Sequence, residues 1–478
     1  MNYLVIIKMI GVLLQFEGAF MLLPFIVGLI YREQQAKYLL IVAVGAFLLG
    51  TLLRLLKPKS QKLHAREGFV ITALAWIVMS VTGALPFYYS KEIPSFTDAV
   101  FESASGFSTT GASILTDIEG MAKCMLFWRS FTHWIGGMGV LVFILIFMKS
   151  TADEMNIMKA ESPGPSVDKL VPKVKTTAFI LYAIYTALTV LTIIALIIAG
   201  MPVFDSFCIG FGNAGTGGFG VRADSCASYS PMCQRIIIVS ILLFGANFKF
   251  YFLIIIKKFR DLLKCEEVFW YLIIYVAAVA LVLIGILKDY SEFEPALRTA
   301  AFQVASVMTT TGYATTDFNL WANMPRAVMV LVMFTGACAG STGGGMKVSR
   351  ILLYFKQIKR EISKNIHPRS VTKIRLDGEV VDDDILRATN VYLMAFFFVY
   401  IFSFLLMCTN GFDLETSFTA VVATLSNIGP GLGLIGPCGG FSGFNTVSKW
   451  TAIFDMIAGR LELFPVLIML APSTWRKK

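Results

Sequence analysis

The sequence predicts an all-α polytopic membrane protein with about ten transmembrane helices. Of the 478 residues, 56% are hydrophobic and only 15% are charged, whereas soluble domains carry about 45–50% apolar and about 25% charged residues. So little polar surface cannot cover soluble domains of this length. The same composition excludes a disordered chain, a collagen and a disulfide scaffold. The net charge of +10 indicates basic cytoplasmic loops rather than a nucleic-acid partner.

Ten segments contain the roughly 20 apolar residues that one helix needs to cross a bilayer. They are 4–30, 38–56, 68–89, 126–148, 177–200, 235–256, 268–287, 326–346, 390–409 and 447–471. An even number of spans puts both termini on one side. If that side is the cytoplasm, the inside segments hold 26 Lys and Arg residues and the outside segments hold six. The positive-inside rule therefore predicts that both termini are cytoplasmic.

Four of the outside segments, 90–125, 201–233, 289–325 and 411–446, are unlike ordinary loops. Each is rich in Gly, Ala, Ser, Thr and Phe, and begins with an apolar stretch too short to span the bilayer. Each stretch leads into a tract centred on a glycine: Gly111, Gly215, Gly312 or Gly429. Phenylalanines precede these glycines by 10, 8, 10 and 11 residues, at Phe101, Phe207, Phe302 and Phe418.

These features predict a fourfold repeat of about 100 residues, each unit being helix, half-helix, glycine tract and helix. The predicted divisions are an extra N-terminal helix pair (1–58) and repeats at 68–150, 176–258, 268–365 and 390–478. The half-helices and tracts look re-entrant, and non-helical backbone at membrane depth must be buried in protein or line a water-filled path. Four copies can surround one central ion pore.

The tract composition suits a filter for a dehydrated cation. Backbone carbonyls replace the hydration shell without fixed charge, and glycine permits the dihedral angles that turn them inward. The expected K⁺-binding residues are Thr109, Thr110, Gly111, Asn213, Ala214, Gly215, Thr310, Thr311, Gly312, Asn427, Ile428 and Gly429. The alternative is four Gly-rich turns between helices, but their even spacing on one side favours a filter.

At these tracts the sequence resembles the Trk/Ktr/HKT superfamily of potassium transporters, through TTGAS, NAG, TTTGYATTDF and SNIGPGLG. The stretch 336–350 resembles the intramembrane gate loop of that family, and 457–465 resembles its last helix, where an arginine faces the pore. The extra helix pair makes the bacterial TrkH/TrkG type the closest in pattern.

The resemblance implies four pseudo-symmetric repeats around one pore, a homodimer, and a cytosolic nucleotide-binding regulatory ring of the TrkA kind. In plant and fungal relatives a serine at the first filter glycine goes with sodium transport. Gly111 therefore favours potassium. The second tract, NAGTGGFG, contains more glycine than this family pattern leads us to expect.

A helix over 326–365 would be about 60 Å long, about twice what one crossing needs. The run Gly340, Ser341, Thr342, Gly343, Gly344 and Gly345 is a poor helix interior and should break it. The break is either a plain kink or a gate in the ion path, and the family resemblance favours a gate.

Arg460 lies inside the last predicted span, where a charge is costly and usually functional. It is either an electrostatic barrier beside the ion path, a snorkelling side chain, or a partner of Asp455 or Glu462.

The basic stretch that begins at Arg350, with three aspartates from Asp382, is either a solvated loop or a docking surface for a cytosolic partner.

The sequence therefore predicts potassium uptake across the inner (plasma) membrane of a bacterium, through a glycine-lined filter with an intramembrane gate. The alternative transport function is a sodium-coupled or sodium-conducting relative. An intramembrane enzyme would need converging catalytic residues, and the sequence contains neither HExxH nor GxSxG. Whether Cys226 and Cys233 pair is left open by the sequence.

Overall fold

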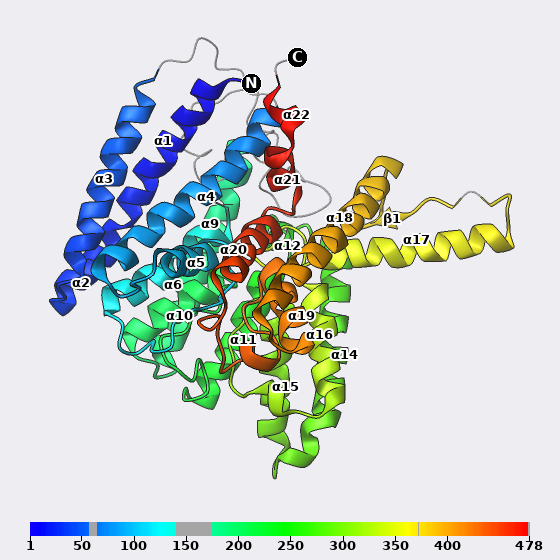
Figure 1. The fold of residues 1–478 in the computed structure, drawn as a ribbon. Helices are drawn as coiled ribbons and strands as arrows, with labels where there is room; N and C mark the ends of the chain where they lie inside the picture. The colour runs from blue at the N-terminus through cyan, green and yellow to red at the C-terminus, as the bar shows by residue number, and fades with distance from the viewer. Residues whose placement is uncertain (57–64, 140–173, 371, 477–478) are drawn as a thin grey trace.

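The computed structural model describes residues 1–56, 65–139, 174–370 and 372–476. The fold is helical apart from a small antiparallel hairpin (Figure 1). Its elements are α1 (Tyr3–Phe20), α2 (Leu22–Tyr31), α3 (Ala36–Arg54), α4 (Ala65–Ser90), α5 (Phe96–Phe107), α6 (Lys123–Gly137), α9 (Val174–Ile198), α10 (Val203–Gly215), α11 (Pro231–Gly245), α12 (Phe248–Ile255), α13 (Phe259–Leu262), α14 (Glu266–Ile286), α15 (Phe293–Met308), α16 (Asn323–Thr335), α17 (Val348–Ile366), β1 (Arg375–Leu376), β2 (Glu379–Val380), α18 (Asp383–Met407), α19 (Leu414–Leu425), α20 (Thr446–Arg460), α21 (Phe464–Leu470) and α22 (Pro472–Trp475).

Four short helices, α5, α10, α15 and α19, are the half-helices that the sequence predicts. They contain 12, 13, 16 and 12 residues, too few to cross the hydrocarbon. Side chains start two of them: Ser95 accepts a hydrogen bond from the Asp98 amide, and Asp413 from the Thr416 amide. Such caps satisfy N–H groups that a helix start leaves without partners.

Each half-helix packs between the two flanking helices of its own repeat, and the repeats join in a cycle. The second helix of each repeat also packs on the half-helix of the next: α6 on α10, α11 on α15, α16 on α19, and α20 on α5. The last contact joins the fourth repeat to the first, so the chain closes a ring of four units. This arrangement confirms the predicted fold class.

The ten predicted spans do not all form single long helices. Among the described residues, six helices, α1–α2 taken as one, are long and apolar enough to cross a membrane, or seven if the bent pair α11–α12 counts as one span. The second helices are short: α11 and α12 meet at 91°, α16 ends at Thr335, and α20 ends at Arg460. Gly336, Glu462 and Leu463 follow these ends with positive φ, which breaks a helix. Part of the predicted span 126–148 lies outside the described residues.

The extra N-terminal pair is held by close backbone contact. A Cβ added at Gly11 or Gly50 would lie within 3.0 Å of the other's carbonyl oxygen, so only glycine allows α1 and α3 this separation. Small residues serve this purpose between membrane helices. α1 also packs on α4 of the first repeat, and the pair therefore flanks the ring of repeats without entering it.

The first and last described helices lie at the same end of the molecule (Figure 1). The rings of Tyr3 and Trp475 stack with centroids 6.3 Å apart. This placement agrees with an even number of crossings. Cys226 and Cys233, whose pairing the sequence left open, are both buried free thiols.

Candidate functional site

The tract after each half-helix has the same backbone conformation in all four repeats. The first residue of each is left-handed: Thr109, Thr216, Thr310 and Asn427 have φ between 52° and 59°. Two residues later comes a glycine with φ of 77° to 93°: Gly111, Gly218, Gly312 and Gly429. Non-glycine residues with positive φ are strained, and such strain gathers at functional sites.

Hydrogen bonds give the same register. The amide of the residue before each glycine donates to the carbonyl five residues back. The pairs are Thr110 with Ser105, Gly217 with Gly212, Thr311 with Ser306, and Ile428 with Ala423. The four half-helices therefore end in one repeated backbone motif.

The four tracts meet around a single axis. A Cβ added at Gly111 would lie within 3.0 Å of the Gly217 carbonyl oxygen, and one at Gly218 within 3.0 Å of the Thr311 oxygen. Gly312 stands in the same relation to Ile428, and Gly429 to Thr110. Each glycine thus faces a carbonyl of the next repeat, and the fourth faces the first. We call these four glycines and four carbonyls the glycine ring.

The ring opens to a cavity of about 210 Å³ that all four of its glycines line. The charged residues that line this cavity are Arg129 and Arg222. Arg129 is buried, and its Nε lies 2.5 Å from the Glu102 carboxylate. It also donates to the Gly220 carbonyl at 2.9 Å. Arg129 and Glu102 therefore connect the first repeat to the segment that follows the second tract.

The structure corrects the second tract. Asn213, Ala214 and Gly215 lie in the last turn of α10, and a Cβ at Gly215 would meet the carbonyl of His133 rather than a neighbouring tract. The second tract is instead Thr216, Gly217 and Gly218, of which the Gly217 carbonyl and Gly218 belong to the ring. The other nine predicted residues lie in the three remaining tracts.

A signal for this shift was present in the sequence. Phe207 precedes Gly218 by 11 residues, which matches the offsets of 10, 10 and 11 in the other repeats better than the offset of 8 to Gly215. The extra glycines of NAGTGGFG are the second signal, since they include the ring glycine itself.

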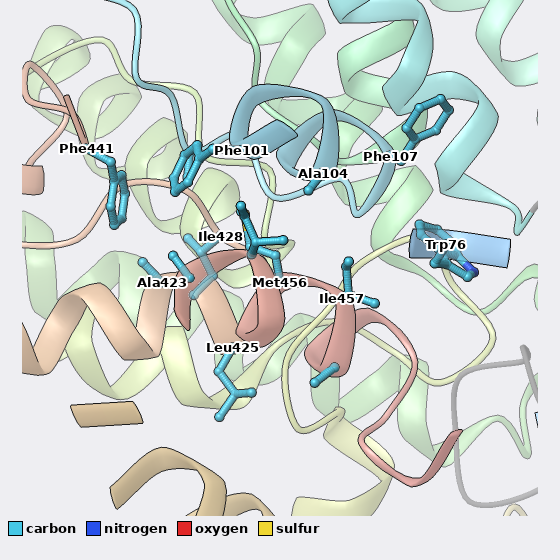
Figure 2. Close-up of a cluster of buried hydrophobic side chains, with 14 of the residues drawn as sticks. Trp76, Phe101, Ala104, Phe107, Ala423, Leu425, Ile428, Phe441, Met456 and Ile457 are labelled. Carbon is cyan, nitrogen blue, oxygen red and sulfur yellow. The ribbon is translucent and has the colours of Figure 1, made fainter. Parts of the chain in front are cut away.

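Behind the ring, side chains of the first and fourth repeats form one apolar cluster. Figure 2 shows Phe101, Ala104 and Phe107 of α5 gathered with Ile428, Met456 and other buried residues. Asn427 joins the same two repeats by donating to Thr110 Oγ1 at 3.0 Å and to the Met456 carbonyl at 2.8 Å. Dense packing resists small displacements, so this cluster fixes the ring's width on that side.

Residues 336–347, between α16 and α17, lie against the end of the ring that is opposite the cavity. We call this segment the gate loop. The Gly344 amide donates to Thr310 Oγ1 at 2.6 Å, and the hydroxyl of Thr342 lies 3.5 Å from that of Thr216. A Cβ at Gly344 would lie within 3.0 Å of the Ser426 carbonyl oxygen. The loop therefore touches three of the four tracts, with Gly340–Gly345 at its centre.

Arg460 joins the gate loop to the end of α6. Its guanidinium donates to the Thr342 carbonyl at 2.6 Å and to the Gly136 and Gly137 carbonyls at 2.7 and 2.5 Å. The expected alternative partners bond elsewhere: Asp455 accepts from Ser403, and Glu462 pairs with Arg350. Arg460 is 9% exposed, so it is a buried link rather than a snorkelling side chain.

Two further features of the gate escaped the sequence analysis. Lys347, the last residue of the loop, is buried and donates through Nζ to the Gly343 carbonyl. Glu267 of α14 accepts hydrogen bonds from the Ala339 amide of the loop and from the Ser349 amide of α17. Neither residue lies in a glycine tract, and Glu267 reaches the loop only in the folded chain, 72 residues from Ala339 in sequence.

These features define a membrane protein that passes cations. They are a ring of glycines and carbonyls, four half-helices that end on this ring, and a loop across the end of the ring opposite the cavity. The chain belongs to the TrkH family, described as cation transport proteins, which matches residues 37–477. This membership confirms the prediction of a transporter rather than an enzyme.

Similar proteins agree along the whole chain. The Trk system potassium uptake protein TrkH of Salmonella typhimurium is 35% identical, with 100% of both chains covered. TrkG of Escherichia coli K12 is 31% identical over 99% of this chain and 98% of its own. The crystal structure of the potassium transporter TrkH from Vibrio parahaemolyticus covers 100% of both chains at 32% identity, with a TM-score of 0.90.

Proposed function

We propose that this protein takes up potassium ions across the inner (plasma) membrane of a bacterium. The observation that carries the proposal is the glycine ring, in which the glycine of each repeat faces a backbone carbonyl of the next repeat. Carbonyl oxygens replace the hydration shell of K⁺ and still release the ion, because they carry no full charge. The relatives named above are potassium uptake proteins, which supports the same cargo here.

The proposed ion-binding residues are Thr109–Gly111, Thr216–Gly218, Thr310–Gly312 and Asn427–Gly429. The half-helix ends add to the attraction, since the C-terminal end of a helix has partial negative charge. The ring therefore attracts cations without an acidic side chain. The gate loop closes the path below it, and Arg460 holds the loop there.

Both termini are proposed to be cytoplasmic. The Lys and Arg bias of the connecting segments and the shared position of α1 and α22 (Figure 1) support this orientation. The cavity above the ring then faces the outside, and ions enter from it.

The proposed assembly is a homodimer with a cytosolic nucleotide-binding ring of the TrkA kind. Its docking surface would be the basic helix α17 together with the β1–β2 hairpin, which project from the helical body (Figure 1). We call these two elements the arm. Native mass spectrometry of the protein in nanodiscs should give twice the chain mass.

The test of transport is ion flux into liposomes that hold the purified protein. Rb⁺ and K⁺ should enter and should compete with each other, whereas an equal concentration of Na⁺ should compete weakly. Liposomes without protein provide the baseline. Flux of Na⁺ equal to that of K⁺ would favour the sodium-conducting alternative, and no flux of any cation would contradict a pore.

A further inference from the structure

The two ends of the gate loop meet at one buried carboxylate. Glu267, the second residue of α14, is 4% exposed. Its Oε1 accepts a hydrogen bond from the Ala339 amide at 2.7 Å and another from the Ser349 amide at 3.0 Å. Ala339 lies just before Gly340–Gly345, and Ser349 just after the loop. A single side chain therefore bridges the residue before the glycine run and the first turn of α17 that follows the loop.

These contacts are of the strong kind. Hydrogen bonds to an ionised carboxylate are stronger than neutral ones, and burial increases their strength further. Ser349 is the second residue of α17, so its N–H is one that the helix itself cannot pair. Glu267 thus caps α17 from a different helix and complements the positive end of its dipole.

The neighbouring residue connects the same helix end to the arm. Glu266 Oε2 lies 2.6 Å from Lys356 Nζ on α17, and that amine also donates to the Arg375 carbonyl of β1 at 2.7 Å. Asp377, in the turn of the hairpin, accepts from the Glu266 amide at 2.8 Å. The start of α14 is therefore bonded to the gate loop through Glu267 and to the arm through Glu266.

We propose that Glu267 is a positioning residue of the gate, which holds the loop across the ion path, and that Glu266 couples this hold to the arm. Displacement of the arm would pull on the start of α14 and loosen both ends of the loop at once. This inference rests on the proposed function, because it assigns the loop a closing role in an ion pathway.

The first test compares Rb⁺ flux through wild-type protein with that through Glu267→Ala and Glu267→Gln in liposomes. Loss of two charge-assisted hydrogen bonds should raise basal flux about tenfold in Glu267→Ala. Glu267→Gln, which keeps an acceptor oxygen but no charge, should give a smaller rise. Glu294→Ala is the matched control, because Glu294 is the second residue of α15 and pairs with Arg235 at the surface; its flux should equal wild type.

A second readout reports on the loop itself. Cys338, in the gate loop, is 0% exposed, so alkylation of its thiol, quantified by peptide mass spectrometry, should be slow in wild type. The rate should rise in both Glu267 variants and stay unchanged in Glu294→Ala. If Glu267→Ala fails to fold, the isosteric Glu267→Gln decides the matter.

If Rb⁺ flux and Cys338 alkylation are both unchanged in a folded Glu267 variant, the proposal that Glu267 holds the gate loop in place is wrong. If wild type carries no Rb⁺ while Cys338 still responds to the Glu267 variants, the proposed transport fails and the loop contact stands. Coupling to the arm predicts that Lys356→Ala raises flux in wild type and adds nothing in Glu267→Ala. Independent, additive effects would overturn that coupling.

Discussion

Each ring glycine performs a task that no other residue could. The φ values of Gly111, Gly218, Gly312 and Gly429 lie between 77° and 93°, where L-residues are strained. Their missing Cβ atoms also leave room for the carbonyls of the next repeat. At each position, the positive φ and the close carbonyl of the next repeat are therefore two separate reasons why only glycine fits.

Gly218→Ala should reduce K⁺ flux by at least about tenfold, because the new methyl displaces the Thr311 carbonyl from the ring. Gly200→Ala is the control, since Gly200 has φ of 88° and nothing within 4 Å of an added Cβ. The measurement is Rb⁺ uptake into liposomes. Equal losses in both variants would show that backbone strain alone, and not the ring, accounts for the effect.

Gly111→Ser tests ion selectivity. The serine Cβ would push on the Gly217 carbonyl, so one ligand is displaced while the other three keep their places. K⁺ uptake should fall, and the ratio of Na⁺ to K⁺ uptake should rise severalfold. An unchanged ratio measured with both ions in the same liposomes would speak against the ring as the selective element.

Arg460 combines charge with a three-way hydrogen bond. Arg460→Ala should raise K⁺ flux, because it frees the Thr342 carbonyl of the gate loop from α6. Arg460→Lys keeps the charge but lacks the planar fork that reaches several carbonyls at once. If the link matters, flux rises in both variants; if only the charge matters, it rises in the alanine variant alone. No change in either would contradict both roles.

For individual site residues, the sequence predicts positions well where the signal is a short local motif. In three of the four repeats the predicted tract coincides with the one that lies in the glycine ring, because Thr-Gly and Asn-Ile-Gly recur at even spacing. The second tract was misplaced because NAG imitates the pattern three residues early, where the chain is still helical. The contacts of Arg460, with Thr342 and with Gly136 and Gly137, join positions more than 100 residues apart, and no periodicity indicates them.

At the level of helices, the second member of the second, third and fourth repeats departs from a simple span. Hydropathy averaged over a span-length window does not locate these breaks, because single polar residues such as Asn247 and Glu462 stand among apolar neighbours. The break after α16 was foreseen from Gly340–Gly345, but the helix already ends at Thr335. Gly336, with φ of 70°, starts the non-helical segment earlier than the glycine run alone suggests.

Deletion of residues 343–345 should raise K⁺ flux severalfold, because Gly343 and Gly344 lie against the starts of the third and fourth tracts. The ring itself is untouched, so the preference for K⁺ over Na⁺ should persist. Flux of both ions into liposomes measures the two quantities together, and a size-exclusion profile checks folding. Reduced or unchanged flux in a folded variant would contradict a gate.

For the molecule as a whole, orientation is the property to test. Cys438 is exposed and lines the cavity above the ring, so a membrane-impermeant maleimide added outside intact cells should label it. Cys438→Ser should remove that signal, which excludes labelling at other thiols. Labelling of Cys438 only after the membrane is opened would place the cavity in the cytoplasm and reverse the proposed topology.

The cyclic contacts between repeats also bear on how the protein is made. Because α20 must reach back to α5, and Gly429 to the carbonyl of Thr110, the site stays incomplete until nearly the entire chain has left the ribosome. A product that ends before the fourth repeat holds only three of the four tracts and lacks Arg460. Synthesis of the fourth repeat therefore completes both the glycine ring and the Arg460 contact that holds the gate loop.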